Sequence, residues 1–358
     1  MCLGMSTRFD NNESQVIFEQ LALDVKAGIN FLRSQPGITK VLLWGHSGGG
    51  PTTSFYQAVA ENGPSFCTDP NKLTQCDNSH NDYTGLPKAD GIIFVDAHPG
   101  VGIIGMLRSN NPAVVNEKRP DLLRPDLDPF NPANGYNPNG PSTYSDKFKA
   151  QYFAAQAERM NKLIDDALQK LDLIGHDAYI YTDNGPVVIG ASTSAKLFNL
   201  DLSILCCTVN QQKLLQNDGT IVTEIVHSVR LAHPEDKQTD ATFDGGGRLL
   251  TLKSFLTANA IRATNSLDGI DYCSSNDATD CNVQSISAPL LVTAMGAYYF
   301  IRDSEIHYDF AKSVDKDFVV IAGLLHGITP CPTCPGGPYD KSQQNFFDYV
   351  TAWINKRF

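Results

Sequence analysis

Short, wholly apolar runs alternate with amphipathic segments in the first hundred residues of the chain. Apolar side chains recur at helical spacing over Ser14–Ser34, which predicts a helix that Pro36-Gly37 ends. Val41–Trp44 and Gly91–Asp96 are apolar runs typical of strands that are buried on both faces of a parallel sheet. Between them, Thr52–Asn62 has the pattern of a second helix. This alternation predicts a mostly parallel sheet with helical crossovers.

The same alternation returns near the end of the chain. Pro289–Ala294 and Phe318–Ala322 are predicted strands, and a helix at about Asp303–Ser313 separates them. A last helix is predicted over Ser342–Lys356. These elements extend the sheet that the first hundred residues begin.

Between these two parts, residues 101–287 lack the alternation. They hold a proline-rich loop and a long amphipathic helix, marked by apolar side chains from Phe148 to Leu171. We therefore expect an α/β core made by residues 1–100 and 288–358. Residues 101–287 are expected to form a large cap, inserted between the strand at 91–96 and the strand at 289–294.

The net charge and the hydropathy of the chain limit the classes of partner and the cellular locations that we expect. The formal net charge is −11 and Lys/Arg runs are absent, which argues against a nucleic-acid partner. No stretch approaches the roughly 20 apolar residues of a membrane-spanning helix. Met1–Asp10 has neither the basic start nor the apolar run of a signal peptide. A soluble, cytoplasmic protein is the default expectation, unless a targeting segment precedes residue 1.

The most specific motif is a GxSxG sequence, Gly45-His46-Ser47-Gly48-Gly49, between a predicted strand and a predicted helix. In such a turn the serine is strained and its hydroxyl is lifted above the carboxyl edge of the sheet. Ser47 is then a nucleophile, and the N–H of Gly48 points at the oxyanion that develops on the substrate. A glycine-rich phosphate loop or a plain turn is the alternative for the motif alone.

A histidine and a carboxylate would complete a catalytic triad. His326 directly follows the last predicted strand, where this mechanism places the base. Three carboxylates are candidates for the acid. Asp303 is preferred, although it is also a candidate N-cap, and Glu305 is the second choice. Asp96, at the end of an earlier strand, is the third.

The nine cysteines include three close pairs: Cys67/Cys76, Cys273/Cys281 and Cys331/Cys334. The first two pairs flank polar loops, where local disulfides and reduced thiols fit equally well. Zinc or redox chemistry at the third pair is disfavoured, because a second pair at matching spacing and a thioredoxin-like strand are both missing. We expect the third pair to staple the loop after His326.

Together these motifs resemble the α/β-hydrolase superfamily over about residues 1–62, 91–100 and 289–358, and more narrowly a group of poorly characterised microbial α/β-hydrolases. The shared sequences are STRF and NNES before the first helix, GHSGGG, AHPG, and NPAVVNEKRPDLLRPDLDPFNPANGY at the start of the cap. The resemblance implies hydrolysis of an ester or related acyl bond without a metal or organic cofactor. Many members carry a GTAD-like acid motif where this chain has GAYY.

We therefore expect a serine hydrolase that cleaves a small ester or acyl substrate through Ser47 and His326. The alternative is a non-catalytic protein of the same fold that binds a small apolar ligand. Haloalkane or epoxide hydrolysis is disfavoured, because it needs a carboxylate where Ser47 stands. Aromatic residues of the AMGAYYF segment are expected either to line the acyl pocket or to pack in the core.

The resemblance also implies that the first strands of the fold are missing. Met1–Phe9 is expected to form the fourth strand. The third strand, which lies in space between the fourth strand and the Val41–Trp44 strand, would then be absent. The loop after the third strand normally supplies the second oxyanion N–H. Gly48 alone would remain, unless the chain fills the gap by rearrangement.

Overall fold

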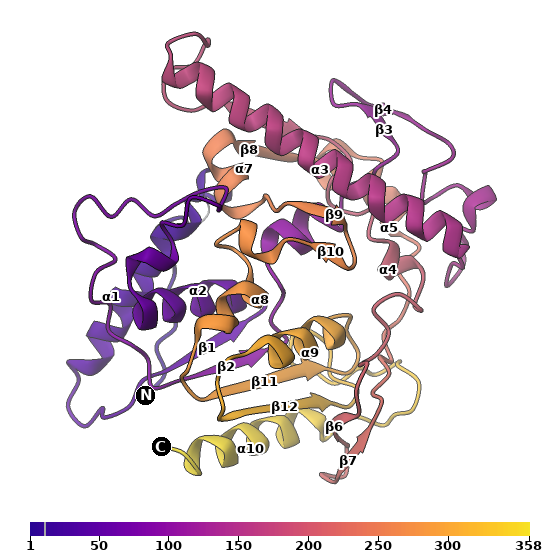
Figure 1. Cartoon of the computed structure of the whole chain (residues 1–358). Coiled ribbons are helices and arrows are strands. Elements are labelled where there is room, and N and C mark those ends of the chain that lie inside the picture. Colours follow the sequence, from indigo (N-terminus) through magenta and orange to yellow (C-terminus); the bar gives the residue numbers. More distant parts are fainter. Residues whose placement is uncertain (11) are drawn as a thin grey trace.

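The computed structural model describes residues 1–10 and 12–358, and its centre is a six-stranded sheet in the order β1-β2-β11-β12-β6-β7 (Figure 1). The strands are β1 Leu42–His46, β2 Gly91–Val95, β6 Gln212–Leu215, β7 Ile221–Glu224, β11 Leu290–Met295 and β12 Lys316–Ile321. In this spatial order β1, β2, β11, β12 and β6 are all parallel to their neighbours, and only the last strand, β7, is antiparallel to β6. The expectation of a mixed α/β protein with a mainly parallel sheet is confirmed.

Helices cover both faces of this sheet at β2 and β11, as their apolar sequences predict, whereas Trp44 of the edge strand β1 is exposed, contrary to the expectation of burial on both faces. One face packs on α1, α2 and α9, whereas α10 covers the other and lies below the sheet in Figure 1. Alternate side chains of β2 divide accordingly: Phe94 is buried with Phe55 of α2, and Val95 is buried with Trp353 of α10. These helices are α1 Leu21–Arg33, α2 Gly49–Asn62, α9 Ile301–Phe310 and α10 Ser342–Asn355.

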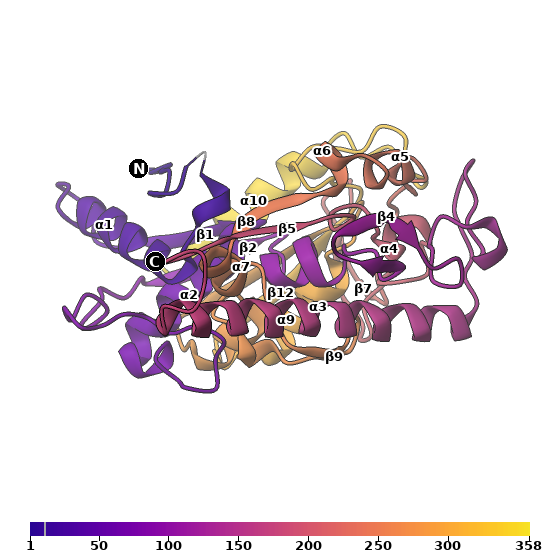
Figure 2. The ribbon, with the colours of Figure 1, turned by 90° about the horizontal axis from the view of Figure 1, so that it is seen from above.

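Residues 101–287 form a second layer, which lies over the central sheet and its helices. Its main element is α3, Asp146–Gly175, which crosses the top of the molecule in Figure 1 and much of its width in Figure 2. The Ser145 side chain accepts a hydrogen bond from Phe148 N and so caps α3. The other elements are a π-helical turn Gly102–Leu107, β3 Val114–Asn116, β4 Arg119–Leu123, β5 Pro186–Ile189, α4 Leu197–Leu200, α5 Asp236–Asp240, α6 Phe243–Gly246, β8 Arg248–Thr251, α7 Leu252–Ala258, β9 Ala263–Asn265, β10 Gly269–Ile270 and α8 Thr279–Asn282.

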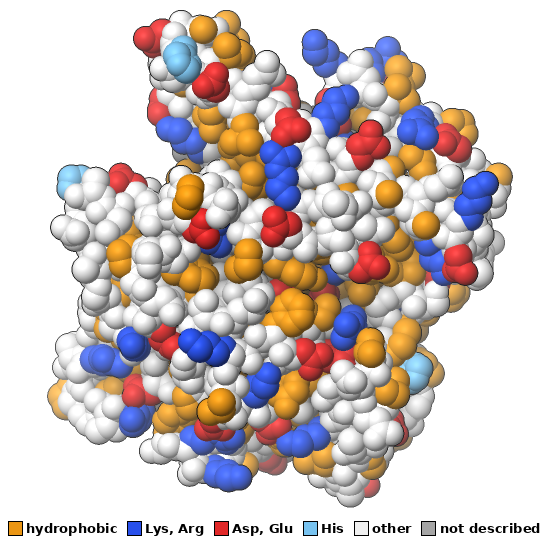
Figure 3. Space-filling model, viewed as in Figure 1, with side chains coloured by type: hydrophobic (Ala, Val, Ile, Leu, Met, Phe, Trp, Pro, Cys, Tyr) orange, Lys and Arg blue, Asp and Glu red, His pale blue; other side chains and the backbone are white. Residues whose placement is uncertain are grey.

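This layer is not wholly separate from the sheet. The hairpin β6–β7 belongs to residues 101–287 by sequence, yet β6 pairs with β12 in the central sheet. Sequence analysis missed these strands because each has only four residues and lies in a long irregular stretch. On the face shown in Figure 3, basic and acidic side chains are intermixed over both layers.

The strand predicted at Met1–Phe9 is wrong. Residues 1–10 contain a turn and no strand. The apolar side chains of Leu3 and Met5 pack over Gly28 of α1, and Arg8 is fixed to Asp24 by a 2.8 Å ion pair. These contacts attach the segment to a helix instead of to a strand. Among the described residues, β1 therefore pairs only with β2 and forms an edge of the sheet.

The helix predicted from Ser14 starts seven residues later, at Leu21. The preceding segment is held by α7 instead: Phe18 N donates to Thr257 Oγ1, which in turn donates to Val16 O. This tertiary pairing gives the backbone of the segment partners outside a helix. No helix within residues 1–10 and 12–358 has the length and apolar character that crossing a membrane requires.

All three close cysteine pairs form disulfides: Cys67–Cys76, Cys273–Cys281 and Cys331–Cys334. The adjacent residues Cys206 and Cys207 form a fourth, which sequence analysis missed. Cys2 is a free, exposed thiol. The Cys331–Cys334 disulfide lies in the loop after His326, as expected.

Candidate functional site

Ser47 occupies a strained turn between β1 and α2. Its φ angle is 52°, in the left-handed region that residues other than glycine rarely adopt. The turn is tight: a Cβ on Gly45 would lie 2.6 Å from Thr53 Oγ1, and one on Gly50 would lie 2.6 Å from Ala97 Cβ. Close packing therefore requires glycine at Gly45 and Gly50, and the strain expected at the serine of a GxSxG turn is present.

The end of β2 brings a carboxylate beside this turn. Because β1 and β2 are parallel with His46 opposite Val95, Ser47 and Asp96 leave the same edge of the sheet side by side. Ser47 N also donates to Val95 O at 3.3 Å. Asp96 has a φ of 44° and is fully buried. Its Oδ1 accepts a 2.9 Å hydrogen bond from Met295 N, at the end of β11.

The other oxygen of Asp96 binds His326. His326 Nδ1 donates to Asp96 Oδ2 at 2.6 Å, so the third choice among the candidate acids is the one that contacts the histidine. Burial raises the pKa of the Asp96 carboxyl, and the hydrogen bond from His326 opposes that rise. Because His326 Nδ1–H donates a hydrogen bond to Asp96, the neutral ring is the tautomer in which Nε2 carries no proton.

Three further side chains hold His326 in place. His46 Nε2 donates to His326 O at 2.8 Å, which ties the histidine loop to the Ser47 turn. The ring of Tyr298 stacks on the imidazole with centroids 4.4 Å apart, and Phe300 meets it edge-on at 5.5 Å. The first tyrosine of the GAYY sequence, Tyr298, thus packs against the histidine that was expected to be the base. Within the described chain, neither Ser47 Oγ nor His326 Nε2 makes a hydrogen bond, a common state of sites without substrate.

The two preferred acids are elsewhere, which corrects the expectation for Asp303 and Glu305. Asp303 is fully buried and pairs with Arg108 at 2.8 Å. Glu305 accepts hydrogen bonds from the backbone N–H groups of Val209 and Asn210. The physical reason is that α9 begins at Ile301, so both carboxylates lie inside the helix. The bend after β11 instead presents the ring of Tyr298 to His326.

A second histidine–carboxylate pair lies beneath the site, and sequence analysis gave it no role. His307 Nδ1 contacts Asp280 Oδ1 at 2.6 Å, and its Nε2 contacts the carbonyl oxygen of Ala97 at 3.2 Å. Both side chains are fully buried. Asp280 and His307 are 27 positions apart, on α8 and α9, so no spacing rule identifies the pair.

A cavity of about 690 Å³ adjoins the Ser47 turn. Gly48 and His98 line it from the sheet side, whereas Ile104, Asn259 and Asp277 line it from residues 101–287. Gly48 N–H, at the start of α2, has no acceptor in the described chain. The N–H that was expected to face an oxyanion is therefore available.

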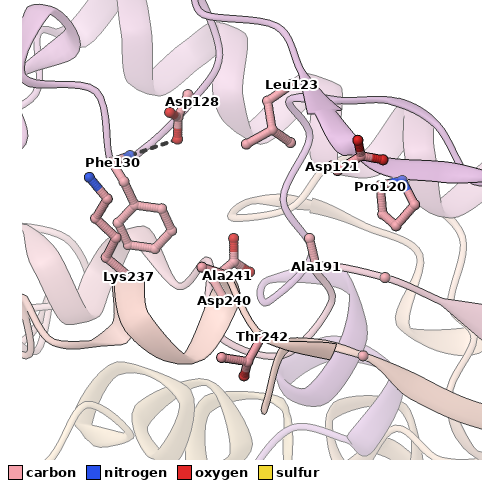
Figure 4. Close-up of a pocket in the computed structure, with 12 residues that line it drawn as sticks. Pro120, Asp121, Leu123, Asp128, Phe130, Ala191, Lys237, Asp240, Ala241 and Thr242 are labelled. Atoms are coloured by element: carbon pink, nitrogen blue, oxygen red, sulfur yellow. Dashed lines mark hydrogen bonds between the residues drawn. The ribbon is translucent and has the colours of Figure 1, made fainter. Parts of the chain in front are cut away.

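A separate cavity of about 450 Å³ lies within residues 101–287 (Figure 4). Pro120, Phe130, Lys237 and Asp240 are among its lining residues, and burial raises the pKa of Asp240 to about 6. Gly247 lines both this cavity and the cavity beside Gly48, and neither Ser47 nor His326 is among the lining residues of either cavity.

The candidate metal ligands are already engaged. Cys206, Cys207 and His227 present ligand atoms within 4.8 Å of one another, but the two sulfurs are joined as a disulfide. The CxxC sulfurs of Cys331 and Cys334 are joined in the same way. Comparisons of the chain with family models, with curated proteins and with solved structures found no match.

Proposed function

We propose that this protein is a serine hydrolase of the α/β-hydrolase class that cleaves a carboxylic ester or related acyl bond. The observation that carries the proposal is the 2.6 Å contact between His326 Nδ1 and Asp96, at the strand ends that also present the strained Ser47. A carboxylate, an imidazole and a strained serine at one sheet edge are the parts that acyl transfer needs.

The chemistry follows from these positions. His326 Nε2 accepts the Ser47 proton as Ser47 Oγ bonds to the substrate carbonyl carbon, and the carbonyl oxygen becomes an oxyanion. Asp96 stabilises the resulting imidazolium. His326 then passes the proton to the leaving alcohol as the ester C–O bond breaks, which gives an acyl-enzyme. Water, deprotonated by His326, releases the acid and restores Ser47.

The second layer supports a cap function for residues 101–287. The cavity beside Gly48 is walled on one side by these residues, so the layer encloses a space where a small substrate would sit. We propose a small-molecule ester or acyl substrate for this space. The triad mechanism uses protein groups alone and needs no metal or organic cofactor.

Ser47→Ala tests the proposal. It should lower kcat for short p-nitrophenyl esters by about 10⁴- to 10⁶-fold, because the nucleophile is removed. Ser65→Ala is the matched control, since Ser65 is an exposed serine far along the chain from the site. Ser47→Ala protein that keeps most of its activity would contradict the proposal and favour a non-catalytic protein that binds a small apolar ligand.

A further inference from the structure

An oxyanion needs more than one hydrogen-bond donor for full stabilisation. Gly48 N–H is one donor. No described strand lies on the other side of β1, so no loop from such a strand supplies a second. A second donor must be a polar hydrogen near Gly48 that is held in place and has no partner.

His98 stands directly beside Gly48. It lies two residues after Asp96, and its backbone N–H donates to Ser47 O at 3.2 Å. A Cβ on Gly48 would be only 3.3 Å from His98 Nε2. The imidazole therefore packs against the α-carbon of the residue whose N–H faces the oxyanion. The absence of a side chain at Gly48 leaves room for the ring.

The hydrogen bonds of His98 determine which nitrogen carries its proton. Gly100 N donates to His98 Nδ1 at 3.1 Å, so Nδ1 is an acceptor and the proton is on Nε2. Burial, together with the charges of His307 and His326, lowers the pKa of His98 to about 3. The ring is consequently neutral at ordinary pH. Nε2–H has no acceptor in the described chain, and His98 lines the cavity.

The ring is also fixed before substrate binds. Thr279 Oγ1 donates to His98 O at 2.9 Å, and Phe300 packs against the imidazole with centroids 6.0 Å apart. Just beyond His98, Asp277 accepts the N–H groups of Val101 and Gly102. A donor held in this way needs little reorganisation during the reaction, which is the condition for strong electrostatic stabilisation.

We propose that His98 Nε2–H is the second oxyanion donor, acting beside Gly48 N–H. This inference rests on the proposed hydrolase function. His98 would exchange no proton with the substrate: it would only donate a hydrogen bond that strengthens as the carbonyl oxygen gains charge. It is thus distinct from His326, which carries the proton.

Substitution at His98 tests this role through kcat. His98→Leu keeps a side chain of similar bulk but has no donor, and should lower kcat by about 10²- to 10³-fold with KM within a few-fold. His98→Gln places an amide N–H near the position of Nε2, so its kcat should be at least tenfold higher than that of His98→Leu. His80→Ala, at an exposed histidine, is the control. The acidic limb of the kcat/KM profile should be the same in all active variants, because His326 remains the base.

Two kinetic outcomes would overturn the proposal: a kcat of His98→Leu within threefold of wild type, or equal losses in His98→Leu and His98→Gln. A serine-reactive fluorophosphonate probe separates this failure from failure of the hydrolase proposal. If the probe labels Ser47 in wild type while His98→Leu keeps full kcat, only the His98 role is wrong. If the probe does not label wild type, both proposals are wrong.

A measurement on wild-type protein covers the case in which His98 variants do not fold. In ¹⁵N-histidine NMR, His98 should show the neutral Nε2–H form, and its Nε2–H resonance should move downfield when a boronic-acid transition-state analogue binds Ser47. An unchanged Nε2–H resonance in the saturated complex would overturn the proposal.

Discussion

Two histidine–carboxylate pairs in this protein have nearly identical contacts and opposite surroundings. The Nδ1–oxygen distance is 2.6 Å both for His326 with Asp96 and for His307 with Asp280. The His307 pair is fully buried, and its Nε2 is occupied by the carbonyl of Ala97. The His326 side chain is 25% exposed, and its Nε2 has no partner in the described chain. A short histidine–carboxylate contact therefore does not by itself distinguish the proposed base from a buried structural pair, whereas the Nε2 of His326, unpartnered among the described residues, does.

The surroundings of the buried pair also determine the charge state of His307. Burial lowers the pKa of His307, but the charge and hydrogen bond of Asp280 outweigh it and raise that pKa above its usual value. Both ring nitrogens then donate, one to Asp280 and one to the Ala97 carbonyl. Because Ala97 lies between Asp96 and His98, the buried pair anchors the segment that carries the proposed acid and oxyanion donor. We infer a structural role for His307 and a chemical one for His326.

The largest effect is expected at Asp96, the carboxylate of the proposed catalytic pair. Asp96→Asn should lower kcat by up to about 10⁴-fold with little change in KM, because an amide favours the wrong tautomer of His326 and cannot stabilise the imidazolium. Steady-state kinetics on a p-nitrophenyl ester measure it. Glu305→Gln should change the kcat of folded protein by less than about tenfold. Equal losses in the two variants would contradict the assignment of Asp96.

The corresponding change in the buried pair should act on stability instead. Asp280→Asn removes the charge and hydrogen bond that offset the burial of His307, and it should lower the free energy of unfolding by about 3–5 kcal/mol. Urea unfolding at pH 7 measures it. Adding His307→Gln removes the unpaired histidine and should restore part of the loss. A folded Asp280→Asn protein of wild-type stability whose kcat is as low as that of Asp96→Asn would reverse the comparison.

A smaller effect is expected in the pH dependence of the free energy of unfolding. It comes from the titration of His98, which lies between the two pairs. Its folded pKa of about 3 is lower than the unperturbed value of 6.5. Between these values the unfolded chain binds a proton that the folded chain does not, so stability is lost as pH falls through this window. From pH 6.5 to about pH 5 the loss from this group is about 2 kcal/mol.

His98→Gln lacks this titration, so its free energy of unfolding should fall by about 2 kcal/mol less than that of wild type over the same range. Urea unfolding of both proteins at the two pH values gives the difference. Identical pH dependence in the two proteins would show that His98 does not hold an uncharged ring in the folded state.

The smallest effect is expected in the loop that carries His326, the proposed base. The Cys331–Cys334 disulfide closes the loop after His326, and Cys331 N donates to Gly323 O on the other side of the histidine. Reduction should loosen this loop and lower kcat by less than about tenfold without unfolding the protein. Circular dichroism and intact mass after alkylation accompany the assay. Full activity with both thiols alkylated would show that the disulfide does not position His326.

The parts of the site that sequence analysis predicted are those set by local rules. Ser47 follows from a strand, a glycine-rich turn and a helix in succession. His326 follows from its place after the last strand. The acid depends on three-dimensional details that a sequence does not display: α9 begins early enough to bury Asp303 against Arg108, and the bend after β11 brings Tyr298 onto His326. The carboxylate of Asp96 is therefore the one that contacts His326 Nδ1.

The errors in the fold have a similar origin. The apolar residues of Met1–Phe9 are compatible with a strand, but Leu3 and Met5 pack on α1, where Gly28 has no side chain and leaves room for them. The strands β6 and β7 are too short to stand out, and they join the sheet only through pairing with β12. Periodicity identifies long elements, whereas short ones are fixed by tertiary contacts.

The most direct test of the central claim, that Ser47 is a nucleophile activated by His326 and Asp96, is the mapping of a fluorophosphonate adduct by peptide mass spectrometry. We predict one adduct, on the peptide that contains Ser47, formed rapidly in wild type, far more slowly in His326→Ala and not at all in Ser47→Ala. An adduct on another residue, or labelling of Ser47 at the same rate in wild type and His326→Ala, would contradict the account.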